Sequence, residues 1–480
     1  MSNSLKAGFA RADISPRSAS VPLAGYGATS LRMSARIQDP LFVHATALES
    51  GDERCVLMVL DNLCAVEETV ALWRKAIGER TGLPANRVFI STTHTHSAPD
   101  LRSALPSAID YRDVFLTERL ADTAARAVAD LKPAQLSYGT VEVGRPGFRM
   151  NFDRHYYAVP IEKKNSYTKE DLVPDVGAVR SKSLKGEDYA TVEHVEEADH
   201  SLQLMRFARD AADDIILMNF AAHATVTGGT KNPTVSSDYP DAFIRRLEMI
   251  CPGTKCMFLQ GCAGNLVAQT RLEREGVLGV TIPATTKKAP DGTPYKTTSH
   301  YAYGAALAGY AFKALLRCMK PSATDGLSFR QKIYTGTHDH SEDHLVPQAQ
   351  KVVDLFRAKG SCPEVKELCA EIGMDYHHCI SIVTNAAQPQ TGEIELNAIR
   401  VGDCAITTLP FEPFSSIGEH IKEASPFEVT FVNGYSCGYQ SYMPNKQAHP
   451  DCYESCKLRY LRGTGEILEE ELGSLLQELK

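Results

Sequence analysis

The sequence predicts an α/β protein in which mixed β-sheets are layered with α-helices and the active site lies at the carboxyl ends of strands. Two observations support this fold class. Short apolar runs of strand type alternate with amphipathic segments of helical period in the first part of the chain, as in layered α/β domains. Several strand-type runs also end directly in histidines, acidic residues or glycine-bearing loops, where ligands bind in such folds.

Hydrophobic periodicity and turn residues give the expected order of elements. Strands are expected at residues 43–48, 56–60, 88–90, 135–143, 201–207, 215–220, 256–259, 327–334 and 428–432, with a hairpin over 395–409. Helices are expected at 66–82, 116–131, 238–249, 301–319 and 415–424, as a pair within 346–372, and from 467 onwards. Asp238 is the expected N-cap of its helix, because its side chain can accept a bond from the free N–H groups of the first turn.

We expect one domain over residues 1–480, because no repeat, low-complexity tract or clear linker interrupts the chain. Residues 158–197 are rich in Lys and Glu, and residues 271–299 are polar and carry Pro and Gly. Both segments are therefore expected to be insertions or lid loops.

Composition excludes several classes of protein. The formal net charge of −8 leaves no basic excess to neutralise phosphates, so no nucleic-acid partner is expected. No apolar run reaches the length of a membrane span, and the N-terminus lacks the apolar core of a secretory signal. We therefore expect a cytoplasmic protein without integral membrane association, whose 13 cysteines are reduced thiols. The sequence is compatible with a homo-oligomer.

The segment from Ser91 to Pro99 is the strongest functional signal. It follows an apolar strand and carries His94 and His96, two residues apart. His223 and Glu412 likewise follow strand-type runs, and the last strand leads into the tyrosines Tyr435, Tyr439 and Tyr442. Two histidines and a carboxylate with one open position form a ligand set of catalytic zinc. Buried histidines bonded to the backbone, with an exposed glutamate, are the alternative.

Other segments have weaker signals. Asn151 to Tyr157 is expected to line a cleft, with a solvated surface loop as the alternative. Gln260 and Gly261 open a glycine-bearing turn after a strand, where backbone N–H groups can approach a ligand closely. Cys262 lies in the same turn, either as a nucleophile paired with a histidine or as a small residue filling a tight turn. No G-x-S-x-G motif is present.

Taken in order, these motifs resemble the N-terminal catalytic domain of the neutral/alkaline, non-lysosomal ceramidases over nearly the whole chain. The matching segments are residues 8–16, 25–27, 91–99, Asn151 with Arg154, 220–223, 237–240, 260–264, 409–412, 439–444 and 463–466. The resemblance implies a Zn²⁺ ion held by His94, His223, Glu412 and Tyr442. It further implies catalytic roles for His96, Arg154 and Tyr442.

The resemblance also implies how the surrounding residues act. Asn151, Gln260, Gly261 and Tyr439 are expected to bind the substrate, and Asp238 to support a ligand histidine. Val267 stands where the family carries a serine, so we expect the family's reaction on another substrate.

The expected function is that of a cytoplasmic, single-domain, zinc-dependent hydrolase. It would cleave a C–N amide bond by metal-activated water, on a small or polar amide rather than on ceramide. Three alternatives stay open: a ceramidase or N-acyl lipid amidase, a zinc ester or lactone hydrolase, and a catalytically impaired binding homologue.

Overall fold

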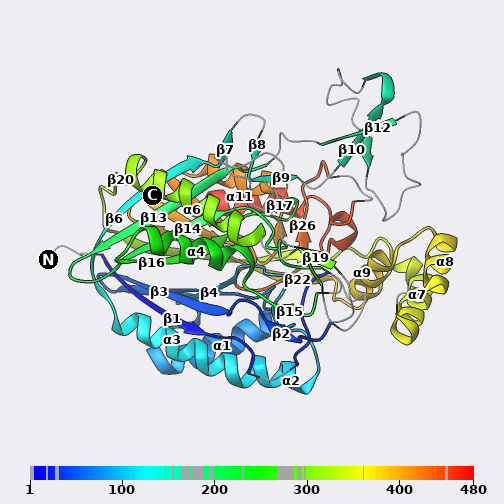
Figure 1. Ribbon diagram of the computed structural model, residues 1–480, viewed down its shortest axis with the longest axis horizontal. Helices are drawn as coiled ribbons and strands as arrows, with labels where there is room; N and C mark the ends of the chain where they lie inside the picture. Colours follow the sequence, from blue (N-terminus) through cyan, green and yellow to red (C-terminus); the bar gives the residue numbers. More distant parts are fainter. Residues whose placement is uncertain are drawn as a thin grey trace.

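The structure is a computed structural model of the chain. It describes residues 5–17, 20–26, 32–145, 148–153, 156–163, 166, 173–175, 189–193, 198–229, 232–268, 286–288, 294–296, 299–360, 362–448 and 452–480. Mixed sheets layered with helices confirm the predicted α/β class (Figure 1).

The largest sheet has nine strands, in the order β16-β14-β13-β6-β1-β3-β4-β5 with β20 beside β6. Its strands are β1 (Lys6–Asp13), β3 (Phe42–Ser50), β4 (Glu53–Leu60), β5 (Val88–Thr92), β6 (Lys132–Glu142), β13 (Ser201–Arg209), β14 (Asp214–Phe220), β16 (Thr254–Gln260) and β20 (Lys320–Pro321). The β4–β5 and β14–β16 pairs are parallel, and the other pairs are antiparallel. Thr46 on β3 lies 3.7 Å from the sulfur of Met257 on β16, although β14, β13, β6 and β1 stand between these two strands in the sheet. The sheet is therefore strongly curved.

A second sheet of four strands packs on the concave face of the first. Its strands, in spatial order, are β21 (Leu327–Thr337), β22 (Thr391–Val401), β23 (Cys404–Thr408) and β25 (Val429–Asn433). Alternate residues along each strand point to opposite faces, so Leu57 and Val59 enter the core between the sheets while Met58 faces the helices. Phe89 of the first sheet stacks on Phe329 of the second at a centroid distance of 6.0 Å.

Helices cover the outer faces and complete an α/β/β/α arrangement. α1 (Glu67–Thr81) and α3 (Thr117–Ala129) pack on one half of the large sheet, and α4 (Asp238–Ile250) and α6 (Ser299–Arg317) on the other. α10 (Ser415–Ala424) and α11 (Thr464–Gln477) cover the second sheet. None of the helices in the described part of the chain combines the length and apolar character that a membrane crossing needs.

The helices α7 (Val346–Lys359), α8 (Pro363–Ile372) and α9 (Tyr376–Ala386) form a separate small core at one end of the molecule, drawn in yellow at the right of Figure 1. The predicted insertions contain a three-stranded sheet of β10 (Tyr156–Pro160), β11 (Val173–Asp175) and β12 (Tyr189–Glu193), and a pair β18 (Thr286–Lys288) and β19 (Pro294–Lys296). Most of their remaining residues lie outside the described ranges.

Short paired strands complete the fold around the site. They are β2 (Arg36–Ile37) with β15 (Thr234–Val235), β7 (Gly144–Arg145) with β8 (Phe148–Arg149), β9 (Asn151–Asp153) with β17 (Leu266–Ala268), and β24 (Glu412–Pro413) with β26 (Tyr442–Met443). α9 was not predicted from the sequence, nor was the segment of α2 (Pro106–Ile109) with a π-helical turn at Asp110–Leu116. The last helix begins at Thr464 rather than Ile467, and the N-cap of α4 is Ser237 rather than Asp238.

Candidate metal centre

His94 and His96 lie just beyond β5, at the end of a buried parallel strand. His94 has a positive φ of 61°, a conformation that costs energy for a residue with a side chain and is common at functional sites. Its Nδ1 lies 2.8 Å from the carbonyl oxygen of Leu63. A carbonyl can only accept, so Nδ1 carries the proton and Nε2 presents a lone pair toward the site.

His223 follows β14 and is completely buried. Its Nδ1 lies 2.5 Å from the carbonyl oxygen of Ala263, which fixes the same tautomer as in His94. Three buried polar side chains hold the chain just before it. Asn151 donates to the carbonyl of Ala221 at 2.6 Å, and both Gln260 and the hydroxyl of Tyr239 donate to Ala222 at 2.6 Å.

Glu412, on the short strand β24 that follows β23, brings a carboxylate to the same point. Its Oε2 is 3.1 Å from Nε2 of His94 and 3.2 Å from Nε2 of His223. The hydroxyl of Tyr439 donates to the other oxygen, Oε1, at 2.5 Å. Glu412 also pairs in register with Tyr442 between the short strands β24 and β26, so both residues are held on one rigid pair of strands.

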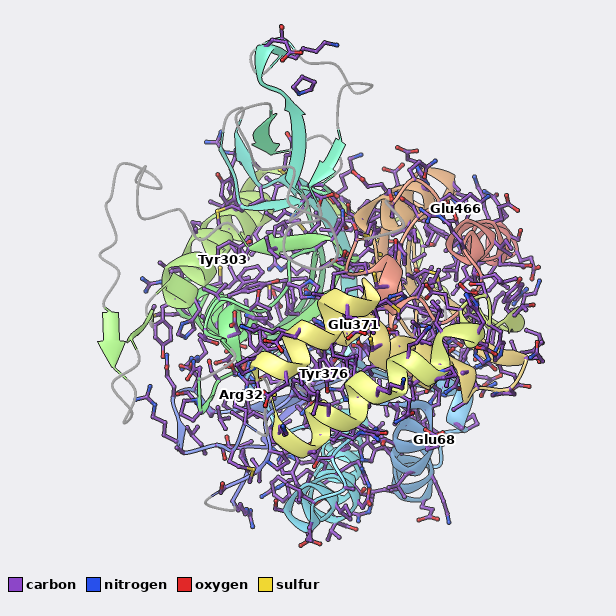
Figure 2. The ribbon with its side chains drawn as sticks, turned by 90° about the vertical axis from the view of Figure 1, so that its right-hand side faces the viewer. Arg32, Glu68, Tyr303, Glu371, Tyr376 and Glu466 are labelled. Carbon is purple, nitrogen blue, oxygen red and sulfur yellow. The ribbon has the colours of Figure 1, made fainter. Side chains whose placement is uncertain are left out.

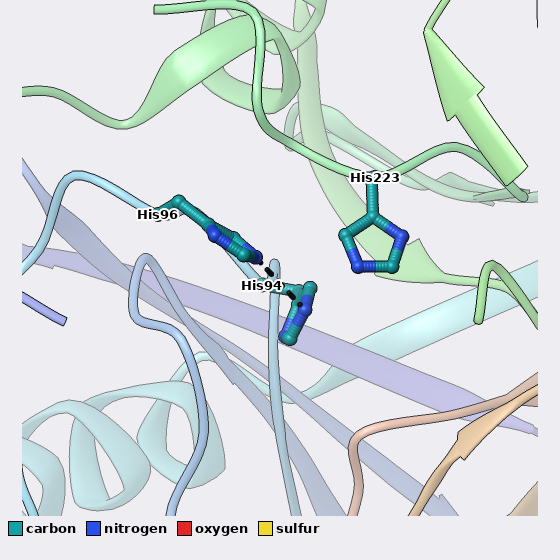
Figure 3. Close-up of side chains that lie close together, drawn as sticks. All are labelled: His94, His96 and His223. Carbon is teal, nitrogen blue, oxygen red and sulfur yellow. Dashed lines mark hydrogen bonds between the residues drawn. The ribbon is translucent and has the colours of Figure 1, made fainter. Parts of the chain in front are cut away.

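The three histidines converge, as Figure 3 shows. Nε2 of His96 lies 3.2 Å from Nε2 of His94, and one ring nitrogen from each of His94, His96 and His223 falls within a cluster 4.8 Å across. The tyrosine Tyr435 packs its ring against that of His94 at a centroid distance of 4.1 Å. The donor atoms of His94 and His96, His223 and Glu412 therefore come from three distant segments and meet in one buried place.

Electrostatics keep the site ready for a cation. Burial alone would raise the carboxyl pKa of Glu412, but the imidazoles of His94 and His223 hold that pKa well below its usual range. Burial, together with its two histidine neighbours, holds the pKa of His96 well below 6.5, so His96 is neutral. Burial and the charge of Glu412 raise the pKa of Tyr439 well above 10, so its hydroxyl stays protonated and keeps donating.

These residues fit a metal ion. The lone pairs of His94 and His223 face a carboxylate oxygen, and such electron-rich atoms repel one another unless positive charge lies between them. A proton can join only one pair of these atoms, whereas a metal ion satisfies all of them at once. Zinc–nitrogen bonds of about 2.0–2.1 Å in a tetrahedral arrangement separate donors by roughly 3.3 Å, close to the 3.1–3.2 Å found here.

A cavity of about 910 Å³ opens beside this centre. His96, Glu412, Tyr439 and Tyr442 line it, whereas His94 and His223 do not. A volume of this size suits a small-molecule ligand. His96 therefore lies between the buried ligand-type atoms and the space where a substrate would sit.

Several predicted substrate-binding residues have another role. Asn151 is fully buried and its amide is occupied by Ala221, Asp199 and His200, so it holds loops together. Gln260 holds Ala222 in the same way. Neither Asn151 nor Gln260 lines the cavity. Their side-chain N–H groups instead satisfy buried backbone carbonyls next to His223, which need hydrogen-bond donors. Tyr439 does line the cavity and also supports Glu412.

The glycine-bearing turn packs closely against neighbouring backbone. A Cβ at Gly261 would lie 3.1 Å from backbone atoms of Phe220 and Ala221, which it packs against. A Cβ at Gly264 would likewise lie too close to the backbone carbonyl oxygen of Glu412. Gly261 is thus closely packed against the end of β14, and its contact with a substrate stays a prediction. Cys262 is buried against α10, and burial raises the pKa of its thiol, as expected of a small core residue.

The carboxylate of Asp238 bonds to Thr227 and Tyr239, and its support of a ligand histidine stays a prediction. Its carboxylate accepts from the N–H and hydroxyl of Thr227, at 2.7 and 2.6 Å, and from the N–H of Tyr239. The ligand histidines instead donate to backbone carbonyls of Leu63 and Ala263. Arg154 lies outside the described residues. Val267 lies in β17 and is absent from the cavity lining.

Gly25 and Tyr26 pack against His96, a contact that was not predicted from the sequence. The ring of His96 fills the space beside Gly25, where a Cβ would lie 2.6 Å from Nδ1. Gly25 also has φ of 89°, which favours glycine. The Tyr26 ring packs edge-on against His96 at 5.1 Å. The Gly25-Tyr26 motif was visible in the sequence, but its contact with His96 depends on the fold.

Comparison with solved structures identifies the fold. The crystal structure of neutral ceramidase from Pseudomonas aeruginosa matches with a TM-score of 0.67 at 18% sequence identity, covering 100% of this chain and 75% of that chain. A structure titled "Ceramidase complexed with C2" matches with a TM-score of 0.65 at 15% identity, covering 99% and 75%. No protein-family profile and no curated protein sequence matches this chain. The chain thus has the fold of neutral ceramidases, as the resemblance implied.

Proposed function

We propose that this protein is a zinc-dependent hydrolase that cleaves the C–N bond of a small or polar amide. The convergence of His94, His223 and Glu412 carries the proposal, because these buried lone pairs point at one another and require a cation between them. The similarity of the fold to that of neutral ceramidases supports the amide class of the reaction.

In this proposal His94, His223 and Glu412 hold the ion, and Tyr442 supplies a fourth ligand from the strand paired with Glu412. When bound, zinc lowers the pKa of a water molecule and polarises a carbonyl group. Tyr439 fixes the orientation of the Glu412 carboxylate through its short hydrogen bond. Arg154 remains a proposed partner of the scissile amide.

His96 is the proposed residue on the substrate side. Unlike the other two histidines, it has no partner for Nδ1 among the described residues, so no backbone carbonyl fixes its tautomer. A neutral imidazole that faces the cavity can donate to a carbonyl oxygen or pass a proton to a departing amine.

The lining of the cavity argues against ceramide as the substrate. Apart from tyrosines, its apolar members are Pro22, Leu23, Leu63, Val66 and Ile380. Long acyl chains need a continuous apolar surface to be favourably removed from water. Charged and polar side chains make up most of the remaining lining, so a short, polar amide fits better.

A matched pair of neutral probes tests the reaction class. We expect zinc-loaded protein to hydrolyse N-acetylethanolamine, and expect chelation to abolish turnover and added zinc to restore it. Ethylene glycol monoacetate, its ester counterpart, serves as the comparison, with product measured by mass spectrometry. Turnover of the ester alone would make the protein an esterase. Thermal stabilisation by the amide without any product would make it a binding homologue.

Two tyrosine variants test the fourth ligand. Tyr439→Phe removes a hydrogen bond to Glu412 and is expected to weaken zinc binding by about tenfold, as for other partners of metal ligands. Tyr442→Phe is expected to weaken it more, because it removes a ligand oxygen. Competition titration with a zinc chelator measures both affinities. The reverse ranking would contradict the role proposed for Tyr442.

A further inference from the structure

The cavity beside the metal centre is positively charged, although the chain as a whole carries a net charge of −8. Among the described residues, five cationic side chains line it, and the acidic residues of this lining are Asp100 and Glu412. The cations are Arg32, Arg102, Arg357, Lys457 and Arg459. A cavity whose charge opposes that of the protein concentrates ligands of negative charge.

Two of these cations already have protein partners. Arg32 is buried and donates to backbone carbonyls, including His96 at 2.6 Å and Gly229 at 3.0 Å, so it fixes loops around the centre. Arg102 pairs with Asp100 at 3.0 Å. Arg32 is therefore unavailable to a ligand without losing these contacts, and the charge of Arg102 is already paired with a carboxylate.

The other three cations have no carboxylate in direct contact among the described residues, although Asp375 acts on Lys457, and Glu67 on Arg459, over a longer distance. Among the described residues, neither Arg357, Lys457 nor Arg459 forms an ion pair with an acidic side chain. Lys457 donates to the carbonyl of His377 at 2.8 Å, and burial lowers its pKa to about 8. The charge of Asp375 offsets only part of the cost of burying this ammonium group, and a bound anion in direct contact would offset more of it.

A series of ring contacts joins these cations to the metal centre. Tyr442, the neighbour of Glu412, packs edge-on against Tyr453 at 5.6 Å. Tyr453 in turn lies 5.6 Å from the ring of His377 and 5.7 Å from Nζ of Lys457. Lys457 is thus one aromatic ring away from the proposed ligand Tyr442.

The helices α7 and α9 complete this wall of the cavity. Arg357 lies on α7, and its neighbour Phe356 stacks on Tyr376 of α9 at 3.7 Å. His377 follows Tyr376 and lines the cavity with Ile380 and Asn385. Figure 2 shows the yellow helices lying across one face of the molecule, with Tyr376 on that face.

We propose that Arg357, Lys457 and Arg459 form an anion subsite that binds a carboxylate or phosphate group carried by the substrate near its scissile amide. This inference rests on the proposed function, which it narrows to anionic amides such as N-acylated amino acids. The anion would neutralise cations that the protein leaves unpaired, and its attachment near the amide would place the carbonyl beside His96.

Paired substrates and charge variants test the subsite. N-acetylglycine and the phosphate ester of N-acetylethanolamine are the anionic probes, with N-acetylglycinamide and N-acetylethanolamine as neutral counterparts. Arg459→Gln and Arg357→Gln are expected to raise KM for at least one anionic probe by about tenfold, since each removes a charged hydrogen-bond donor. KM for the neutral probes should stay within about twofold. The more affected anionic probe shows whether carboxylate or phosphate is preferred.

Lys351→Gln is the matched control, because Lys351 lies on the same helix as Arg357 and is exposed outside the cavity lining. It changes the net charge equally and should leave every KM unchanged. Equal effects of Lys351→Gln and Arg357→Gln on KM for the anionic probes would overturn the subsite. Equal KM values of the unmodified protein for the neutral and anionic probes would overturn it as well.

Calorimetry separates this inference from the proposed function. His223→Ala protein should still bind N-acetylglycine or the phosphate probe, and adding Arg459→Gln should weaken that binding by about tenfold. Binding that depends on Arg459 without turnover by the natural sequence would support the subsite and refute the hydrolase. Turnover without any binding that depends on these cations would refute the subsite alone.

Discussion

Replacing His94 with alanine is expected to empty the metal centre and to lower kcat/KM for amide hydrolysis by at least about a thousandfold. A catalytic metal ion contributes several kcal/mol to transition-state stabilisation, and about 4 kcal/mol corresponds to a thousandfold in rate. His94 is fully buried, its tautomer is fixed by Leu63, and its Nε2 faces Glu412 at 3.1 Å.

His96→Gln is expected to give a different result, although His96 lies only 3.2 Å from His94. Zinc content should stay at the level of the natural sequence, while kcat falls by about a hundredfold or more, as for loss of a general acid or base. Elemental analysis and turnover measured on the same preparations separate the two residues. His344→Ala controls for loss of an exposed histidine away from the centre.

Two outcomes would contradict this division of roles. Full zinc content in the His94→Ala protein would exclude His94 as a ligand. Equal loss of zinc in the His94→Ala and His96→Gln proteins would make His96 a ligand as well, which its distances permit. Circular dichroism of each variant distinguishes either result from general unfolding.

The sequence predicted the metal-ligand candidates of this site better than the residues that hold its loops. His94, His223 and Glu412 could be proposed because each follows an apolar strand, and the fold brings them together. The bonds of Asn151 and Gln260 to backbone carbonyls could not be predicted. A buried amide bonded to backbone carbonyls and an amide facing a substrate look the same in a sequence, because the distinction depends on which segments the fold brings beside each amide.

The prediction of helices and strands from the sequence was also incomplete. Long strands and helices with clear periodicity were predicted with small errors at their ends, because burial of one face determines them. The helix α9 was missed, although it forms one wall of the cavity. The cationic lining was missed too, because Arg357, Lys457 and Arg459 come from separate segments that only the packing of α7–α9 brings to one cavity.

Gly264→Ala is expected to destabilise the protein by about 1–3 kcal/mol and to weaken zinc binding by about tenfold or more. A Cβ at Gly264 would lie 2.4 Å from the carbonyl oxygen of Glu412 and 2.9 Å from that of Pro413. These are backbone atoms of β24, which cannot rotate away as a flexible side chain could. The turn and β24 must therefore separate, and the 2.7 Å bond from Gly264 N–H to the Pro413 carbonyl must stretch.

That separation acts directly on the metal centre, because the turn holding Gly264 also supplies the Ala263 carbonyl that orients His223. Moving the turn away from β24 moves His223 away from Glu412, so stability and zinc affinity should fall together. Gly309→Ala is the control, since Gly309 is exposed on α6 with open space around its Cβ position. A helical glycine replaced by alanine should raise stability by about 0.5–1 kcal/mol and leave zinc binding unchanged. Urea unfolding and chelator competition measure both quantities, and an unchanged zinc affinity in Gly264→Ala protein would show that the two strands do not align the ligands.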